Sequence, residues 1–338
     1  MSQSGRLNPL VNLNDTKLPI FFLQLGSNTS LFFDIVLKQA ALTNGTENVF
    51  ILTDTNFQLY RDYNCIDISG YAQTERPFDK LYKHHSTNTY FFEKTCFDRW
   101  FIINDVVKDL NINYFVYADC DVLILQDLKP VYDSLIKNKY DGTMMFFERD
   151  DNSITSAHTS FWNNKLLNDF CDFINAKYSD ETAFNVLLKD TLAGKFLDNT
   201  NVSDMILLNV FRIETKPNTL KLLSLEDKGI CFDFNINVSY NGRRHSFVLT
   251  SGTKIKKMIR KGDGLYGHVQ NTEKKAEYLK FYTLHFQGYL TKSLIPVYAT
   301  PANILNSLYN HITGKTEYFK RRAKLLKNRF RDLLRTKR

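Results

Sequence analysis

The sequence predicts an α/β fold, a mixed and mainly parallel β-sheet flanked by helices, from three observations. An apolar segment at 18–26 is followed by helical apolar spacing at 30–45 and by a second apolar segment at 48–54. Parallel strands need a crossover of this kind, so the strand–helix–strand order favours a parallel sheet. The segment 112–118 is apolar nearly throughout, which is typical of a central strand covered on both faces.

The other elements follow from periodicity and from stop signals along the chain. Asn44-Gly45 ends the first helix, because this pair is a strong helix terminator. Helical apolar spacing predicts further helices at 90–111, 128–138, 164–179 and 203–213. Strands or strand-like segments are expected at 64–69, 112–125, 140–148, 220–240 and 280–288.

Composition places the chain among ordinary globular proteins. Of its 338 residues, 43% are hydrophobic and 24% are charged. The absence of a long apolar run predicts no membrane-spanning helix, and residues 1–18 show no apolar core of signal-peptide length. The five cysteines form no CxxC pair, which indicates reduced thiols and a cytoplasmic location.

The net charge of +8 belongs to the C-terminal tail. Residues 315–338 contain eleven Lys/Arg and two acidic residues, so residues 1–314 carry a net charge of −1. A nucleic-acid-binding protein usually carries its basic charge on its folded surface, and we therefore expect no nucleic-acid partner.

The same tail has the pattern of an amphipathic helix. Its apolar residues recur at intervals of four, three, four and three: Phe319, Ala323, Leu326, Phe330 and Leu333. An apolar stripe opposite a basic face is typical of an interfacial helix on an anionic membrane surface. The alternative is a solvated helix packed on the body of the protein.

Two aspartates interrupt the apolar segment "YFVYADCDVLIL" at 114–125, where the strand would leave the core. In an extended chain Asp119 and Asp121 point to the same side, and open α/β sheets bind ligands at the carboxyl ends of their strands. Two converging carboxylates repel each other unless a cation lies between them, and Mg²⁺ or Mn²⁺ prefers oxygen ligands. The pattern predicts a divalent-metal site, with a strand-terminal turn as the alternative.

Four segments together resemble glycosyltransferases of the GT-A fold, and in particular the family-eight-like retaining enzymes. The segment "FVYADCDVLIL" resembles their Asp-x-Asp segment, and "TCFDRWFIINDV" at 95–106 resembles the helix that precedes it. The segments "VSDMILLN" at 202–209 and "LHFQGYLTK" at 284–292 are similar to two later motifs. Four motifs in one order are more specific than any single motif.

The resemblance implies the transfer of a sugar from a nucleoside diphosphate sugar, with UDP as the carrier and with retention. It implies that Asp119, Asp121 and His285 ligate Mn²⁺ (or Mg²⁺), which would act as a Lewis acid toward the departing diphosphate. For His285, the alternative is a core histidine at the sheet edge.

The resemblance also implies donor and acceptor contacts. Arg99, Asp119 and Lys292 would contact the donor, and Asp204 would be the active-site acid. The residues themselves leave alternatives open, which are a structural ion pair for Arg99 and a helix cap for Asp204. Lys292 comes one residue later than in the family pattern, and Met205 stands in the place of a glutamine.

Further candidates come from their positions along the chain. Gln24, Gly26 and Asp54 follow the first two strands and are placed to meet the base and the ribose, although turn residues are equally common there. Glu148, with Asp150 and Asp151, could supply a general base if the reaction inverts, and an exposed acidic turn is the alternative.

Two further candidates lie in the segment "SAHTSFWNN" at 156–164. His158 and Trp162 could shape the acceptor pocket, because an aromatic ring suits the face of a sugar. A tryptophan buried in the core is the alternative.

The predicted organisation is a GT-A domain at 1–298 with a nucleotide-binding half at about 18–150 and an acceptor- and metal-closing half at about 151–298. A helical basic tail at 299–338 follows. The expected partners are a nucleotide sugar, a glycan or lipid-linked acceptor, and an anionic membrane surface contacted through 315–338. The expected location is the cytoplasmic face of a membrane, as a peripheral protein.

Two rival functions fit parts of the same pattern. A phosphatase of the haloacid dehalogenase type would use Asp119 as its nucleophile, but there the Asp-x-Asp motif normally opens the domain. In this chain a strand–helix–strand unit comes first. The second rival is a non-catalytic sugar-binding relative.

Overall fold

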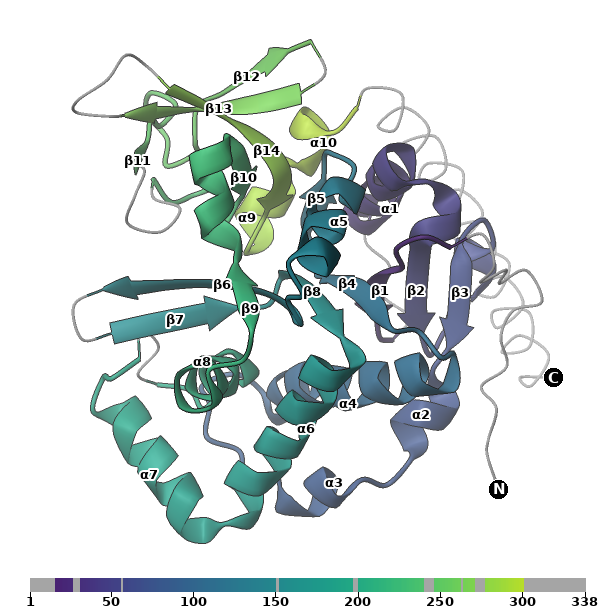
Figure 1. Ribbon diagram of the computed structural model, residues 1–338, viewed down its shortest axis with the longest axis vertical. Helices are drawn as coiled ribbons and strands as arrows, with labels where there is room; N and C mark the ends of the chain where they lie inside the picture. Colours follow the sequence, from purple (N-terminus) through teal and green to yellow (C-terminus); the bar gives the residue numbers. More distant parts are fainter. Residues whose placement is uncertain are drawn as a thin grey trace, which may run out of the picture.

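The computed structural model describes eight segments of the chain, residues 16–26, 31–55, 57–149, 152–196, 200–239, 246–262, 264–270 and 277–300. Within these segments the strands form two sheets, a larger one of eight strands and a smaller one of six. Figure 1 shows the larger sheet across the middle of the molecule and the smaller sheet at one end of it.

The larger sheet has a parallel half and an antiparallel half. The parallel strands are β1 (Ile20–Gln24), β2 (Val49–Thr53), β3 (Asn64–Asp67) and β4 (Tyr114–Ala118), in the order β3-β2-β1-β4. Helix α1 (Leu31–Asn44) connects β1 to β2 and ends at the predicted stop. The sheet continues antiparallel from β4 through β8 (Thr159–Asn163), β6 (Gly142–Arg149) and β7 (Asn152–Ser156), while β9 (Thr219–Lys221) runs parallel to β6. The predicted mixed sheet flanked by helices is confirmed.

Both faces of the larger sheet are covered, and successive residues of β1 show how. Phe21 lies in the core formed with α4 (Tyr90–Asp109), α6 (Asn164–Ser179) and α8 (Asp204–Thr215). Ile20 and Phe22 lie in the opposite core, with α1, α5 (Lys129–Lys137) and the smaller sheet. This alternation is what a strand buried on both faces requires, and it explains the continuous apolar sequence of the strands.

The segment 112–125 is not one strand, as the sequence suggested, but two strands in two different sheets. After β4 the chain turns, and the Asp119 carbonyl accepts the N–H of Val122 at 3.0 Å. Strand β5 (Val122–Ile124) then pairs antiparallel with β14 (Glu277–His285) of the smaller sheet. Charged carboxylates are costly to bury, so the chain turns where the aspartates occur and its apolar residues continue in the second sheet.

The second half of the described chain departs most from the expectations. The helix α7 (Glu181–Leu192) was not expected, and much of 220–240 is the 3₁₀-helix η4 (Leu222–Lys228) rather than strand. The smaller sheet also contains β10 (Ile230–Phe232), β11 (Ser246–Phe247), β12 (Met258–Lys261) and β13 (Gly264–Gln270). These strands are short, so their periodicity is weak. The short helices α9 (Tyr289–Lys292) and α10 (Ile295–Tyr298) follow.

Apart from Ala299 and Thr300, the predicted helical tail at 299–338 lies outside the described residues. Among the helices that are described, none combines the length and the apolar composition needed to cross a membrane.

A substitution at Gly142 tests how closely β6 packs on β8. A Cβ atom at this position would lie 2.2 Å from the Phe161 carbonyl oxygen and 2.7 Å from Cδ2 of Leu166. Because the nearer obstacle is backbone, the sheet would have to move, and Gly142→Ala should lower the free energy of unfolding by about 1–3 kcal/mol. Urea titration measures this change. The exposed control Ser179→Ala should change it by about 0.5 kcal/mol or less, and equal effects would contradict the packing described.

Candidate functional site

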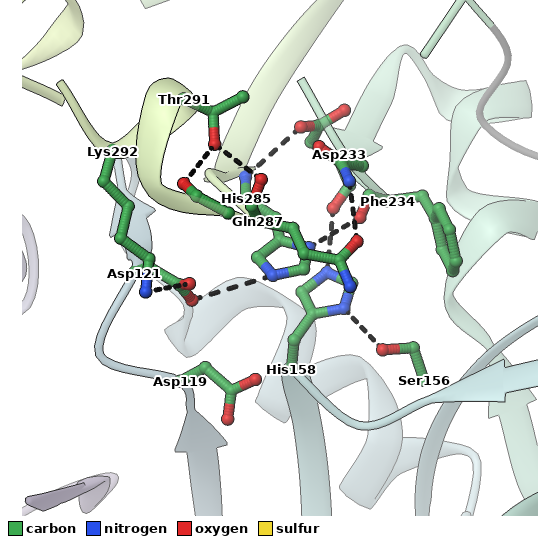
Figure 2. Close-up of polar contacts among 12 residues, drawn as sticks. Asp119, Asp121, Ser156, His158, Asp233, Phe234, His285, Gln287, Thr291 and Lys292 are labelled. Carbon is green, nitrogen blue, oxygen red and sulfur yellow. Dashed lines mark hydrogen bonds and ion pairs between the residues drawn. The ribbon is translucent and has the colours of Figure 1, made fainter. Parts of the chain in front are cut away.

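The structure brings Asp119, Asp121 and His285 together at the carboxyl end of β4. The two aspartates lie in the turn between β4 and β5, and His285 is the last residue of β14. One ligand atom from each residue lies within 4.8 Å of the others. Their grouping depends on the β5–β14 pairing, which places Val122 opposite His285 in the register. Figure 2 shows the three side chains, with the partners of Asp121 and His285.

The ring of His285 is oriented for ligation. Its Nδ1 lies 2.7 Å from the Phe234 carbonyl, which can only accept, so Nδ1 carries the hydrogen and donates it. In the neutral ring Nε2 then keeps its lone pair, and Nε2 lies 3.6 Å from Oδ1 of Asp121. A hydrogen bond from one ring nitrogen to a backbone carbonyl is the usual way in which a protein fixes a metal-binding histidine.

Asp119 is a carboxylate, and one of its two oxygens accepts hydrogen bonds from the protein. Oδ1 accepts hydrogen bonds from Nη1 of Arg99 at 3.0 Å and from the Tyr117 hydroxyl at 2.6 Å. Burial opposes ionisation, but Arg99 and the Tyr117 hydroxyl hold the pKa of Asp119 below its ordinary value. Since both of these bonds go to Oδ1, Oδ2 is suited to accept a cation.

Asp121 has a different electrostatic environment. Burial raises the pKa of its carboxyl; His285 opposes this rise, Asp119 adds to it, and Lys292 opposes it. Nζ of Lys292, from α9, lies 3.1 Å from Oδ2 of Asp121. A divalent cation between the two carboxylates would relieve their repulsion and favour the ionised form of both. The donor set, two carboxylates and an oriented imidazole, therefore fits Mn²⁺ or Mg²⁺.

Arg99 connects this cluster to Asp204. Its Nη2 lies 2.5 Å from Oδ2 of Asp204, which also accepts the indole N–H of Trp100 at 2.9 Å. Burial disfavours the guanidinium charge, but Asp204 and the neighbouring Tyr117 and Asp119 raise the pKa of Arg99. Arg99 thus forms the structural ion pair that was stated as the alternative to a donor contact.

The side chain of Asp204 does not cap helix α8, which was the alternative to an active-site role. The capping residue of α8 is Ser203, whose hydroxyl accepts the N–H of Ile206 at 3.3 Å. Asp204 is 4% exposed and points instead toward Arg99.

The residues predicted to contact the base and the ribose lie at the ends of β1 and β2, and β1 touches the turn between β4 and β5. Gly26 has φ of +76° and donates its N–H to Oδ1 of Asp54 at 2.8 Å, which ties together the ends of β1 and β2. Gln24 is the last residue of β1. The turn itself touches β1, because Sγ of Cys120 lies 3.2 Å from the Leu23 carbonyl.

The structure places the proposed acceptor residues inside the protein. Trp162 is fully buried, packs against Trp100 at 5.0 Å between ring centroids, and donates its indole N–H to Ser160. His158 is 2% exposed and stacks on His285, with ring centroids 4.0 Å apart and planes 12° apart. Neither side chain offers an exposed face to a sugar.

The acidic candidates after the "TMMFFE" strand are less completely described. Glu148 lies on β6 opposite Ser153, but its side chain is outside the described part of the structure. Asp150 and Asp151 are outside the described residues.

Sequence reasoning missed Tyr117, Asp233 and Phe234. Tyr117 contacts Asp119 from two residues earlier, and the two-residue period of a strand is a signal that could have identified it. Asp233 and Phe234 follow β10 in a segment with no recognisable motif. Only the fold brings them to His285.

No family model matches the chain, and no curated protein matches it. Solved structures show partial likenesses. The apo form of mouse xyloside xylosyltransferase 1 is 9% identical with a TM-score of 0.43, covering 61% of this chain and 84% of that one. The galactosyltransferase LgtC, solved with donor and acceptor sugar analogues, is 13% identical with a TM-score of 0.34, covering 57% and 69%.

A cytidylyltransferase from Leptospira borgpetersenii is also among these structures, at 12% identity and a TM-score of 0.31, covering 61% of this chain and 98% of that one. All three overlaps are distant. The function of this chain therefore rests on its own residues.

The ligand set predicts that Asp121→Asn weakens the binding of Mn²⁺. The substitution keeps the shape of the side chain and removes one of two negative charges, so we expect the dissociation constant to rise by more than about tenfold. Calorimetric titration of the folded protein with Mn²⁺ measures the constant. Asp133→Asn, at a carboxylate on α5 that pairs with Lys129, is the matched control. An unchanged constant in Asp121→Asn would exclude this carboxylate as a ligand.

Proposed function

We propose that this protein is a metal-dependent glycosyltransferase of the GT-A type. It moves a sugar from a nucleoside diphosphate sugar, with UDP as the carrier, to a glycan or lipid-linked acceptor, with retention. The observation that carries the proposal is the convergence of Asp119, Asp121 and His285 at the carboxyl end of a central strand, with the lysine Lys292 beside them. A divalent cation and a cationic side chain together suit a diphosphate.

Loss of the diphosphate is the step that needs electrostatic help. A bound Mn²⁺ or Mg²⁺ would supply Lewis-acid stabilisation of the charge that develops on the leaving group. Asp119, Asp121 and His285 would hold it. Lys292 is 39% exposed at its side chain, so its ammonium can reach a phosphate oxygen from its position 3.1 Å from Asp121.

The nucleoside would lie along the ends of β1 and β2. Asp54 accepts the N–H of Gly26 in a left-handed turn, a conformation that glycine adopts without strain. A turn without a side chain lets a ligand approach the backbone closely. Gln24, at the end of β1, offers an amide for contacts with the base.

In this proposal Arg99 is a positioning residue, and Asp204 is the active-site acidic residue. Arg99 bridges the carboxylates of Asp119 and Asp204 and favours the ionised form of Asp119. Asp204 would orient the transferred sugar or the acceptor hydroxyl. Because we propose retention, the reaction does not require Glu148 as a general base.

Turnover of nucleotide sugars separates this proposal from its rivals. We expect UDP release from at least one UDP-sugar in the presence of Mn²⁺, and Asp121→Ala should reduce it by about 10³-fold or more. Coupled detection of UDP measures the rate, with Asp133→Ala as the matched control.

Hydrolysis of phosphate esters is measured in parallel. Phosphatase activity that depends on Asp119 would overturn the proposal in favour of a haloacid-dehalogenase-like enzyme. Binding of a UDP-sugar with no turnover of any donor and acceptor would indicate a non-catalytic sugar-binding relative.

We propose further that the protein binds an anionic membrane surface, on the cytoplasmic face, through residues 315–338. The distribution of charge along the rest of the sequence supports this placement, because residues 246–314 contain nine Lys/Arg and three Asp/Glu, whereas 1–245 contain 24 and 31. Arg260 of β12 donates to the Tyr298 carbonyl of α10 at 3.0 Å. The basic strand therefore lies beside the last described helix, from which the chain continues toward the tail.

Flotation with liposomes tests the membrane proposal. The whole protein should float with vesicles that contain anionic lipid, and removal of 315–338 should abolish flotation, because each basic residue near such a surface contributes about 1 kcal/mol. A variant with Gln at Lys320, Arg321, Arg322 and Lys324 keeps the length of the tail and should bind more weakly. Unchanged flotation after deletion, or equal flotation with neutral vesicles, would contradict the proposal.

A further inference from the structure

A buried ion pair lies directly behind the metal ligand His285. Asp233 follows β10 and Lys256 precedes β12, and both side chains are 0% exposed. Nζ of Lys256 donates to Oδ1 of Asp233 and, at 3.0 Å, to the carbonyl of Asn235. The lysine thus holds both ends of the short segment 233–235.

Stability alone does not account for such a pair. Removing two charges from water costs several kcal/mol per ion, and well-packed apolar residues often serve a core equally well. A buried pair can instead specify one arrangement of the backbone around it. The residues around the Asp233–Lys256 pair indicate which arrangement it specifies.

The segment held by this pair makes two of the hydrogen bonds that position His285. Oδ2 of Asp233 accepts the backbone N–H of His285 at 3.2 Å. The carbonyl of the next residue, Phe234, accepts the ring Nδ1–H at 2.7 Å. The backbone and the imidazole of His285 are therefore both fixed from 233–234, as Figure 2 shows.

The same segment also fixes the ring that stacks on His285. The Asp233 carbonyl accepts Nε2–H of His158 at 2.9 Å, and the Ser156 hydroxyl bonds Nδ1 at 2.8 Å. With both ring nitrogens bonded, His158 provides a fixed plane parallel to His285 at 4.0 Å. His285 can then neither flip nor tilt without breaking contacts on two sides.

We propose that the Asp233–Lys256 pair is a positioning element for the metal site. It holds the Phe234 carbonyl in place, which keeps the hydrogen of His285 on Nδ1 and directs Nε2 toward Asp121. Neither residue touches the metal or the substrate. The proposal rests on the metal-dependent function proposed above, and it adds two residues that lie in none of the recognised motifs.

Two single variants test the pair. Lys256→Met keeps the length of the side chain and leaves Asp233 without its cation, and Asp233→Asn keeps the shape and weakens the attraction. We expect each to raise the Mn²⁺ dissociation constant by about 10–100-fold. Because the two residues act as one unit, the double variant should bind Mn²⁺ no more weakly than the single variant with the larger loss.

The control separates positioning from a general loss of stability. Thr143→Ala removes a fully buried hydroxyl that accepts the N–H of Phe161 in the larger sheet. It should lower the free energy of unfolding yet change the Mn²⁺ dissociation constant by less than about twofold, since the hydrogen bond that it removes joins β6 to β8 and involves none of the residues 233–235, 256 and 285. Mn²⁺ titration and urea unfolding are run on all variants.

A second readout needs no metal. In side-chain ¹⁵N spectra of the wild type, recorded at a pH high enough to leave imidazole rings uncharged, His285 should carry its hydrogen on Nδ1. In Asp233→Asn and Lys256→Met this signature should be lost or mixed, and in Thr143→Ala it should remain. This measurement also covers the case in which one of the variants binds no Mn²⁺.

The outcomes distinguish the two proposals. Unchanged Mn²⁺ affinity and an unchanged tautomer in folded Lys256→Met would overturn the positioning role and leave the metal site intact. A loss of Mn²⁺ affinity that is proportional to the loss of unfolding free energy in every variant, Thr143→Ala included, would also overturn it. A wild type that binds no Mn²⁺ would overturn the proposed function and, with it, the role of the pair in metal binding.

Discussion

The antiparallel pairing of β5 with β14 is the interaction on which the candidate site depends. It joins the two sheets, because β5 follows β4 directly while β14 belongs to the smaller sheet. The N–H of Phe286 donates to the Asp121 carbonyl at 3.1 Å, and the N–H of Leu125 donates to the Tyr282 carbonyl at 2.8 Å. These bonds fix the register that places His285 beside Asp121. A shift of one residue would turn the imidazole to the other face of its strand.

Electrostatics explains why this junction suits a divalent cation. Each carboxylate near it is in contact with a cation of the protein, but the cations are fewer: Arg99 serves Asp119 and Asp204, Lys292 serves Asp121, and Lys256 serves Asp233. These four carboxylates share three cations, so negative charge is in excess. Because Arg99 is the shared cation, the excess falls on Asp119 and Asp204, and an additional cation beside Asp119 is favourable.

Much of the fold was predictable, because its first half follows strong local patterns. The long helix α4 and the apolar strands β1, β2 and β4 are where the periodicity places them. Asp119, Asp121 and His285 were identified by motif and by resemblance, and the structure brings them within reach of one another. The short strands of the smaller sheet were not predictable, since segments of two to seven residues carry little periodicity.

The sequence by itself determined the α/β class, the Asp-x-Asp at the end of a buried strand, and the separation of basic charge into the tail. These features depend on local composition and spacing. Only the tertiary structure decided that the Asp-x-Asp segment crosses between two sheets, that Trp162 is buried, and that Arg99 is already paired with Asp204. The same holds for Asp233 and Lys256, because partners more than twenty residues apart are chosen by the packing of strands, and no local pattern records that choice.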